Sequence, residues 1–345
     1  MKQFLTLITA LLLGNQATSQ TENVLFIGNS FTHMNALCKI YQNLANSKGK
    51  NVFADTIAVS GSTLKGHSER TNTYKKMKAR NWDYVFIQAM SRELSYDSLT
   101  IATETIPYAK ILIDSVKTHN PCAKIYFYLT WGYRNGTADT TNFESFVDMA
   151  DRIESGYMQM SKATGGYPVS PIGMVWKDVR VAYPDLNLYE PDNFHPNPNG
   201  SLIAASTFYA AIYKESPVGG TAPKKVDPTV AKNIQQVAWD FVRKNYSKYN
   251  LDTVQIASSS KIPKMDFTAK PKWLSVTLTN KSAKGLEVKW DFGDGKTSTK
   301  TNPKYFYQKP GKYTITLSVK SGCEWYTIKK VVTVSNKSTS KKKTN

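Results

Sequence analysis

The sequence is poor in cysteine and in long apolar runs, and each shortage excludes a class of protein. Its three cysteines, Cys38, Cys122 and Cys323, match no disulfide framework, and no CxxC motif is present. A Cys38–Cys122 pair stays open, and we interpret all three cysteines as structural. Beyond the N-terminal segment no stretch reaches about 18 apolar residues, so we expect no membrane span in the processed chain.

Arginine is missing from residues 262–345, although most of the chain's formal net charge of +19 lies there. The segment holds 18 lysines against 5 acidic residues, a net of +13. Lysine is poorly suited to bidentate recognition of bases or phosphates. We therefore expect a solvated or weakly polyanion-attracting surface here, and no nucleic-acid partner.

The first nineteen residues are typical of a cleavable export signal. Lys2 precedes the apolar run Phe4–Leu13, and Ala17-Thr18-Ser19 supplies small residues for cleavage before Gln20. No cysteine follows that site, which argues against a lipoprotein anchor, while an uncleaved N-terminal anchor is the alternative. The expected location is outside the cytoplasm of a bacterium: periplasmic, on the cell surface or secreted.

Residues 20–261 alternate short apolar runs with helical patterns, which indicates a parallel sheet covered by helices on both faces. The expected strands are Val24–Ile27, Val52–Val59, Tyr84–Ile87, Ile125–Leu129 and a weaker one at Tyr167–Val169. The expected helices are Asn35–Ser47, Thr71–Arg80, Leu99–Thr118, Pro198–Tyr213 with Asn197 as its N-cap, and Thr229–Tyr246. The predicted fold class is a three-layer α/β sandwich.

Residues 262–335 have a different pattern, with short runs of alternating apolar and polar residues separated by turn signals. The expected strands include Leu274–Leu278, Leu286–Trp290, Tyr313–Val319 and Tyr326–Val334. This spacing predicts a small all-β sandwich. Residues 336–345 are rich in Ser, Lys and Thr, and we expect a disordered basic tail.

Polar residues and glycines follow the predicted strands of the first domain. Ser30 comes after the first strand, Gly61 after the second and Gln88 at the end of the third, while Asp192 and His195 lie in a proline-bounded loop after the last. Ligands of open α/β sheets bind outside the carboxyl ends of the strands, so we expect these residues to meet at one edge.

These residue types suit acyl transfer. A serine at a strand-to-helix turn exposes its hydroxyl as a nucleophile, and a histidine can accept the serine proton. Asp192, three residues before His195, can hold the imidazole tautomer. The N–H of Gly61 and the amide of Gln88 can donate to a developing oxyanion.

Two sequence blocks resemble a known family. The stretch 28–32, Gly-Asn-Ser-Phe-Thr, is similar to the nucleophile block of the SGNH or GDSL-like hydrolases, and the stretch 192–197 is similar to their closing DxxH block. The resemblance spans roughly residues 23–215. It implies esterase or deacetylase activity without metal or cofactor, with Ser30 as nucleophile, His195 as base and Asp192 as its orienter. Gly61 and the Ser30 N–H would form the oxyanion hole.

The family's Gly-x-Asn-Asp block is missing, and the matching strand end reads Ile87-Gln88-Ala89. We assign the side-chain oxyanion role to Gln88 on this basis. The expected substrate is an acylated carbohydrate or glycoconjugate. The alternative is a non-catalytic carbohydrate-binding or adhesion protein on a decayed hydrolase fold.

The second domain carries its own resemblance. The stretches 290–295 (Trp-Asp-Phe-Gly-Asp-Gly) and 309–317 are similar to PKD domains, which are immunoglobulin-like modules. That resemblance implies attachment or spacing and seldom catalysis, with a polysaccharide or the cell surface as the expected contact.

His33, His67 and Trp131 are candidates for lining the substrate site, although surface, structural and core roles are the alternatives. The spacing of His33, His67, Asp192 and His195 matches no metal-ligand pattern, so we expect no metal site.

Overall fold

The computed structural model describes residues 21–137, 145–252 and 263–337, which form two compact units, one on each side of the stretch 253–262. The predicted signal peptide and nearly all of the predicted basic tail lie outside these residues. Each unit has its own buried apolar cluster.

The first unit is built on a five-stranded parallel sheet in the order β2-β1-β3-β4-β5, which confirms the predicted α/β class. Its strands are β1 (Glu22–Gly28), β2 (Val52–Ala58), β3 (Tyr84–Ile87), β4 (Lys124–Tyr128) and β5 (Val169–Ser170). The central strands are almost wholly apolar because helices cover both of their faces.

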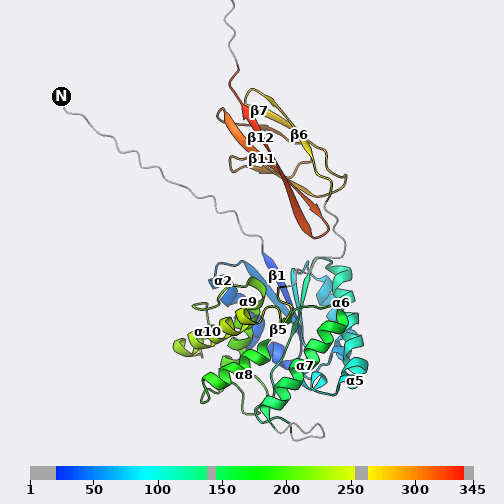
Figure 1. The fold of residues 1–345 in the computed structure, drawn as a ribbon, viewed down its shortest axis with the longest axis vertical. Helices are drawn as coiled ribbons and strands as arrows, with labels where there is room; N and C mark the ends of the chain where they lie inside the picture. The colour runs from blue at the N-terminus through cyan, green and yellow to red at the C-terminus, as the bar shows by residue number, and fades with distance from the viewer. Residues whose placement is uncertain (1–20, 138–144, 253–262, 338–345) are drawn as a thin grey trace, which may run out of the picture. The chain divides into compact units, whose positions relative to one another are not determined.

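Helices form the outer two layers. They are α1 (Ser30–His33), the 3₁₀ turn η1 (Met34–Ala36), α2 (Leu37–Ser47), α3 (Leu64–Ser68), α4 (Thr71–Lys78), the 3₁₀ turn η2 (Ser91–Leu94), α5 (Ser98–Thr100), the π-helical turn η3 (Ile101–Thr105), α6 (Ile106–His119), α7 (Phe146–Thr164), α8 (Ile172–Ala182), α9 (Pro198–Tyr213) and α10 (Pro228–Lys244). Figure 1 shows α2, α9 and α10 on one side of the sheet and α6 and α7 on the other. Helices α7 and α8 were not predicted from the sequence.

Helix α9 begins where the sequence predicts. The Asn197 side chain accepts hydrogen bonds from the N–H groups of Asn199 (3.0 Å) and Gly200 (3.1 Å), and Pro198 takes the first helical position. The helix is buried nearly all round, and Phe208 packs against Phe26 of β1. This cap and this packing fix the end of the loop that carries Asp192 and His195.

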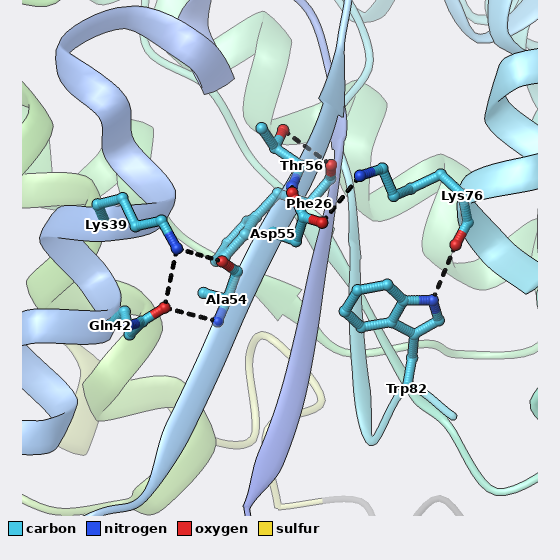
Figure 2. Close-up of polar contacts among 8 residues, drawn as sticks. All are labelled: Phe26, Lys39, Gln42, Ala54, Asp55, Thr56, Lys76 and Trp82. Atoms are coloured by element: carbon cyan, nitrogen blue, oxygen red, sulfur yellow. Dashed lines mark hydrogen bonds and ion pairs between the residues drawn. The ribbon is translucent and has the colours of Figure 1, made fainter. Parts of the chain in front are cut away.

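Side chains of α2 pair with the outer edge of β2. The Gln42 carboxamide oxygen accepts from Ala54 N (3.0 Å), and Lys39 Nζ donates to Ala54 O (3.2 Å) (Figure 2). One turn further on, Asn46 bonds both the N–H (2.7 Å) and the carbonyl (3.3 Å) of Val52. The backbone groups of Val52 and Ala54 at the sheet edge are thereby satisfied without another strand.

The second unit is a sandwich of two antiparallel sheets, in the orders β10-β7-β6 and β12-β11-β8-β9. Its strands are β6 (Phe267–Lys272), β7 (Ser275–Asn280), β8 (Val288–Asp291), β9 (Thr297–Ser298), β10 (Lys304–Phe306), β11 (Gly311–Ser321) and β12 (Glu324–Val334). Trp290 is fully buried between the sheets, with Phe267 packed edge-on at 5.1 Å between ring centroids. The predicted all-β sandwich is confirmed.

Cys38 is buried and free, so a Cys38–Cys122 disulfide is not formed. Every helix among the described residues is too short or too polar to cross a bilayer.

Candidate active site

A pocket of about 220 Å³ opens at the carboxyl edge of the parallel sheet. Its lining is Asn29, Ser30, Phe31, Ser60, Gly61, Met90, Ser91, Tyr133, Phe194 and His195. The structure therefore brings Ser30, Gly61 and His195 together, as the strand-end argument predicts. It does not place Gln88, His33, His67 or Trp131 among the lining residues.

Ser30 stands at the sharp turn between β1 and α1. Asn29 caps the helix, because its side-chain oxygen accepts from Phe31 N (3.1 Å). Among the residues that the structure describes, no hydrogen bond occupies the Ser30 hydroxyl. The hydroxyl therefore borders the pocket as an unengaged polar group.

Asp192 and His195 form a hydrogen-bonded dyad across the pocket from this turn. Asp192 Oδ2 lies 2.6 Å from His195 Nδ1, and Asp192 Oδ1 accepts from the N–H groups of Phe194 (3.1 Å) and His195 (2.9 Å). Asn193 adopts a positive φ of 66°, which folds the loop so that the carboxylate reaches back to the ring. Partial burial opposes ionisation, but the hydrogen bonds from His195 and Phe194 prevail and lower the pKa of Asp192.

The second ring nitrogen of His195 is buried and has no hydrogen-bond partner within the described chain. Nδ1 donates to an ionised carboxylate, so in the neutral ring Nε2 carries the lone pair. His195 and Ser30 line the same pocket, so His195 Nε2 can accept a proton from a group in that pocket.

The predicted oxyanion role of Gln88 requires its amide to face the pocket, and in the structure it does not. Its side chain is fully buried, and its two N–H groups donate to Asn29 Oδ1 (2.9 Å) and Ala89 O (2.9 Å). Its oxygen accepts from Asn29 N (2.9 Å) and from the Thr32 hydroxyl (2.6 Å). With both N–H groups already engaged, the amide clamps the turn that carries Ser30 instead of facing the pocket.

Gly28 makes this clamp possible. A Cβ at this position would lie 2.3 Å from the Gln88 side-chain oxygen and 2.3 Å from the Thr32 hydroxyl. His67 holds the same residue from the other side, since its Nε2 lies 2.7 Å from Gly28 O and must donate to it. Burial, reinforced by the charge of Arg70, outweighs the hydrogen bond to Gly28 O and lowers the pKa of His67. His67 is therefore structural and not a substrate-lining residue.

Gly61 lies in the turn that follows β2. Ser62 N donates to Val59 O (2.9 Å), and Gly61 takes a φ of 69°, a conformation that favours glycine. The neighbouring Ser60 hydroxyl bonds His33 Nε2 at 2.9 Å. His33 is exposed and contacts the pocket residue Ser60 without lining the pocket itself.

Trp131 is a core residue behind the pocket. Its indole stacks between Phe31 (4.5 Å) and Trp176 (4.2 Å), and its N–H donates to Phe194 O (3.0 Å). Because it is fully buried, it cannot serve as a stacking wall for a sugar. It supports Phe31 and Phe194, which line the pocket.

The aromatic and Met90 lining was not predicted from the sequence. Phe31 and Phe194 each adjoin a predicted catalytic residue, and Met90 and Ser91 directly follow the third strand, so position along the chain was the available signal. Among the described residues, no group of His, Cys, Asp and Glu side chains is arranged to hold a metal ion.

Glu93 is a buried carboxyl beside the pocket residue Met90, and its carboxylate accepts from Met90 N (2.9 Å) in the loop after β3. Burial outweighs the lowering effect of the backbone N–H groups of Met90 and Leu64 and raises the pKa of Glu93 to about 7.

This raised pKa predicts a loss of stability with rising pH. The native carboxyl holds its proton more tightly than the unfolded one, so the free energy of unfolding should fall between about pH 4.3 and about pH 7. Glu93→Gln, which keeps a neutral acceptor, should escape this loss. Urea unfolding at pH 5 and pH 8 should show the variant gaining roughly 3 kcal/mol relative to the wild type at the higher pH. Parallel pH dependence of the two proteins would contradict the assignment.

Comparison with known proteins agrees with this division of the chain. The PKD domain family model matches residues 268–335. A microbial collagenase from Vibrio alginolyticus is 49% identical over 45 residues, which are 13% of this chain and only 6% of the collagenase.

Solved structures resemble the first unit. A DUF4886-family protein from Bacteroides uniformis is 18% identical, with a TM-score of 0.57, and the match covers 69% of this chain and 98% of that one. A GDSL-like lipase from Parabacteroides merdae is 16% identical, with a TM-score of 0.42, over 55% of this chain and 95% of that one. The chain thus joins an α/β unit that shares its fold with the DUF4886-family protein to a second unit that the PKD domain family model matches.

Proposed function

We propose that this protein is a serine ester hydrolase of the SGNH type. The observation that carries the proposal is the Asp192–His195 dyad, whose buried Nε2 has no partner among the described residues and lines the same pocket as Ser30. A structural histidine would be expected to have both nitrogens satisfied, as His67 does.

The proposed reaction has two halves. The Ser30 oxygen attacks the ester carbonyl while His195 Nε2 takes the hydroxyl proton, and that proton then leaves with the alcohol. Water repeats the sequence on the acyl-enzyme, with His195 again as base, and releases the carboxylic acid. Asp192 holds the ring through Nδ1 and stabilises the imidazolium that forms in each half.

With the Gln88 amide engaged elsewhere, the proposed oxyanion hole consists of the backbone N–H groups of Ser30 and Gly61. Both residues line the pocket, and the Gly61 turn is shaped by a positive φ. Backbone donors held by a rigid turn stabilise the tetrahedral oxyanion without reorganisation during the reaction.

The proposed substrate is a short acyl ester, such as acetyl, on a carbohydrate. The pocket is small, and Phe31, Met90 and Phe194 give it an apolar lining that fits a short acyl chain. The export signal predicted at residues 1–19, and a PKD domain that could hold the protein on a polymer, support an extracellular polysaccharide or glycoconjugate as target. No cofactor is required for this chemistry.

The second candidate is a non-catalytic carbohydrate-binding protein. The Gln88 amide favours this second candidate, because both of its N–H groups are already hydrogen-bonded. The side-chain oxyanion donor that the family resemblance implies is therefore absent at this strand end. A fluorophosphonate probe separates the two, since it labels only an activated serine. We expect labelling of the wild type and none of Ser30→Ala or His195→Ala. Acetate release from a panel of acetylated polysaccharides would then identify the substrate, and an unlabelled wild type would exclude the hydrolase.

The two separate apolar cores predict that the hydrolase unit is autonomous. A chain ending at residue 258 should unfold cooperatively and keep the full-length KM and kcat for a small aryl ester. Circular dichroism melting and steady-state kinetics on both lengths check this expectation. An insoluble or inactive short chain would mean that the PKD domain completes the α/β unit.

A further inference from the structure

One face of the PKD domain carries positive charge without any acidic residue. It is the outer face of the three-stranded sheet β10-β7-β6 (β6 and β7 are labelled in Figure 1). Val276 and Leu278 of β7 are buried in the core, so the alternation of a strand turns Ser275 and Thr277 to the opposite face.

Strand register sets the composition of this face. Thr277 pairs with Lys304 of β10 and with Lys270 of β6, which places a lysine on each side of a threonine. Ser275 pairs in the same way with Phe306 and Lys272. The three lysines are exposed, and Phe306 is 62% exposed.

The charges on this face are uncompensated. Within the described part of the PKD domain, no ion pair involves Lys270, Lys272 or Lys304, while Asp266 and Glu287 bond other lysines. Adjacent strands lie about 4.8 Å apart, so the flanking lysines are roughly 10 Å apart across the sheet. Their potentials overlap, because the screening length is also about 10 Å at 0.1 M salt.

Trp273 extends this face at the β6–β7 turn. Its indole is 46% exposed, and its φ of 53° is a conformation that a bulky residue rarely adopts. The ammonium groups of Lys272 and Lys337 lie 5.0 and 5.1 Å from the centre of its ring system. A half-exposed tryptophan with a positive φ beside two cations is a candidate for contact with a ligand.

We propose that these residues, Lys270, Lys272, Lys304, Phe306 and Trp273 around the hydroxyls of Ser275 and Thr277, form a lysine–aromatic face that binds a linear anionic polysaccharide. Lysines pair with the carboxylates of the polymer, the hydroxyls bond its hydroxyls, and the aromatic rings stack on its sugar rings. The central hydroxyl strip favours a hydrated polymer over a membrane, and the absence of arginine disfavours nucleic acid.

The proposal goes beyond ester hydrolysis and stands apart from it. Binding is a property of the PKD domain alone, so full-length Ser30→Ala should bind the polymer like the wild type. Binding assays on this background also prevent turnover of the polymer. A wild type that binds the polymer but hydrolyses no ester would reject the catalytic proposal and leave this one intact.

The test measures binding of the full chain to polygalacturonate, with neutral xylan as the comparison polymer. Lys270→Gln/Lys304→Gln should weaken polygalacturonate binding about tenfold or more in dilute buffer, and added salt should reduce the difference. The matched control is Lys289→Gln/Lys329→Gln, which removes two exposed lysines from the other sheet of the same domain. The control should bind within about twofold of the wild type.

Trp273→Gly separates binding from folding. Glycine accepts the positive φ, so the melting temperature should stay close to that of the wild type while binding weakens. Equal losses in the two double-lysine variants would overturn the proposal, because net charge alone would then explain binding. Tighter binding to xylan, duplex DNA or anionic phospholipid vesicles than to polygalacturonate would overturn it as well.

Discussion

Replacing Ser30 with alanine is expected to lower kcat for an aryl acetate by about 10³ or more, and replacing His195 should do the same. The two side chains line one pocket and would act as a unit, so the double variant should lose little beyond either single one. Steady-state kinetics with active-site titration measures all three.

His33→Ala is the matched control for His195. His33 is exposed and its side chain bonds Ser60 at the edge of the site, so its removal should lower kcat less than tenfold. If Ser30→Ala kept most of the activity, or if His33→Ala were as damaging as His195→Ala, the assignment of nucleophile and base would fail.

Gln88→Ala is expected to lower the free energy of unfolding by about 2–4 kcal/mol, because it removes the acceptor of Asn29 N and of the Thr32 hydroxyl and opens a cavity. Activity should fall as well, since the turn that carries Ser30 loses its clamp. Urea unfolding and kinetics on the same preparation give both quantities.

Gln235→Ala provides the control. Gln235 is equally buried and likewise bonds one backbone N–H and one carbonyl, at Gly219 (3.0 Å) and Gly220 (2.9 Å), but it lies outside the pocket. It should reproduce the stability loss and leave kcat unchanged. Unaltered stability in Gln88→Ala, with kcat lowered by 10²–10³, would instead restore the oxyanion role of the amide.

The sheet and the convergence of Ser30, Gly61 and His195 could be predicted because strand ends and turns have local sequence signals, such as apolar runs followed by glycine or proline. Gln88 shows where such reasoning ends. Its position after β3 was predicted correctly, but which way the amide turned depended on Asn29, 59 residues away in the sequence. Gly28 determines that contact by lacking a side chain, and no periodicity reveals it.

Trp131 and helix α7 illustrate the same limit. The pattern placed Trp131 at the carboxyl edge, yet its burial comes from Phe31 and Trp176, which arrive from distant segments. Helix α7 includes Gly156, which weakens the helical pattern; a Cβ there would lie 2.2 Å from Leu94 O. Tertiary packing thus selected a residue with poor helix propensity.

The pairing of β2 with α2 side chains also bears on self-association. An open strand edge can recruit a strand from another molecule and so start aggregation. Val52 and Ala54 are already bonded by Asn46, Gln42 and Lys39, and at the opposite edge Val169 N donates to Tyr249 O (2.9 Å). These groups are therefore not offered to a second copy, which disfavours growth of a continuous sheet from the described part of either edge.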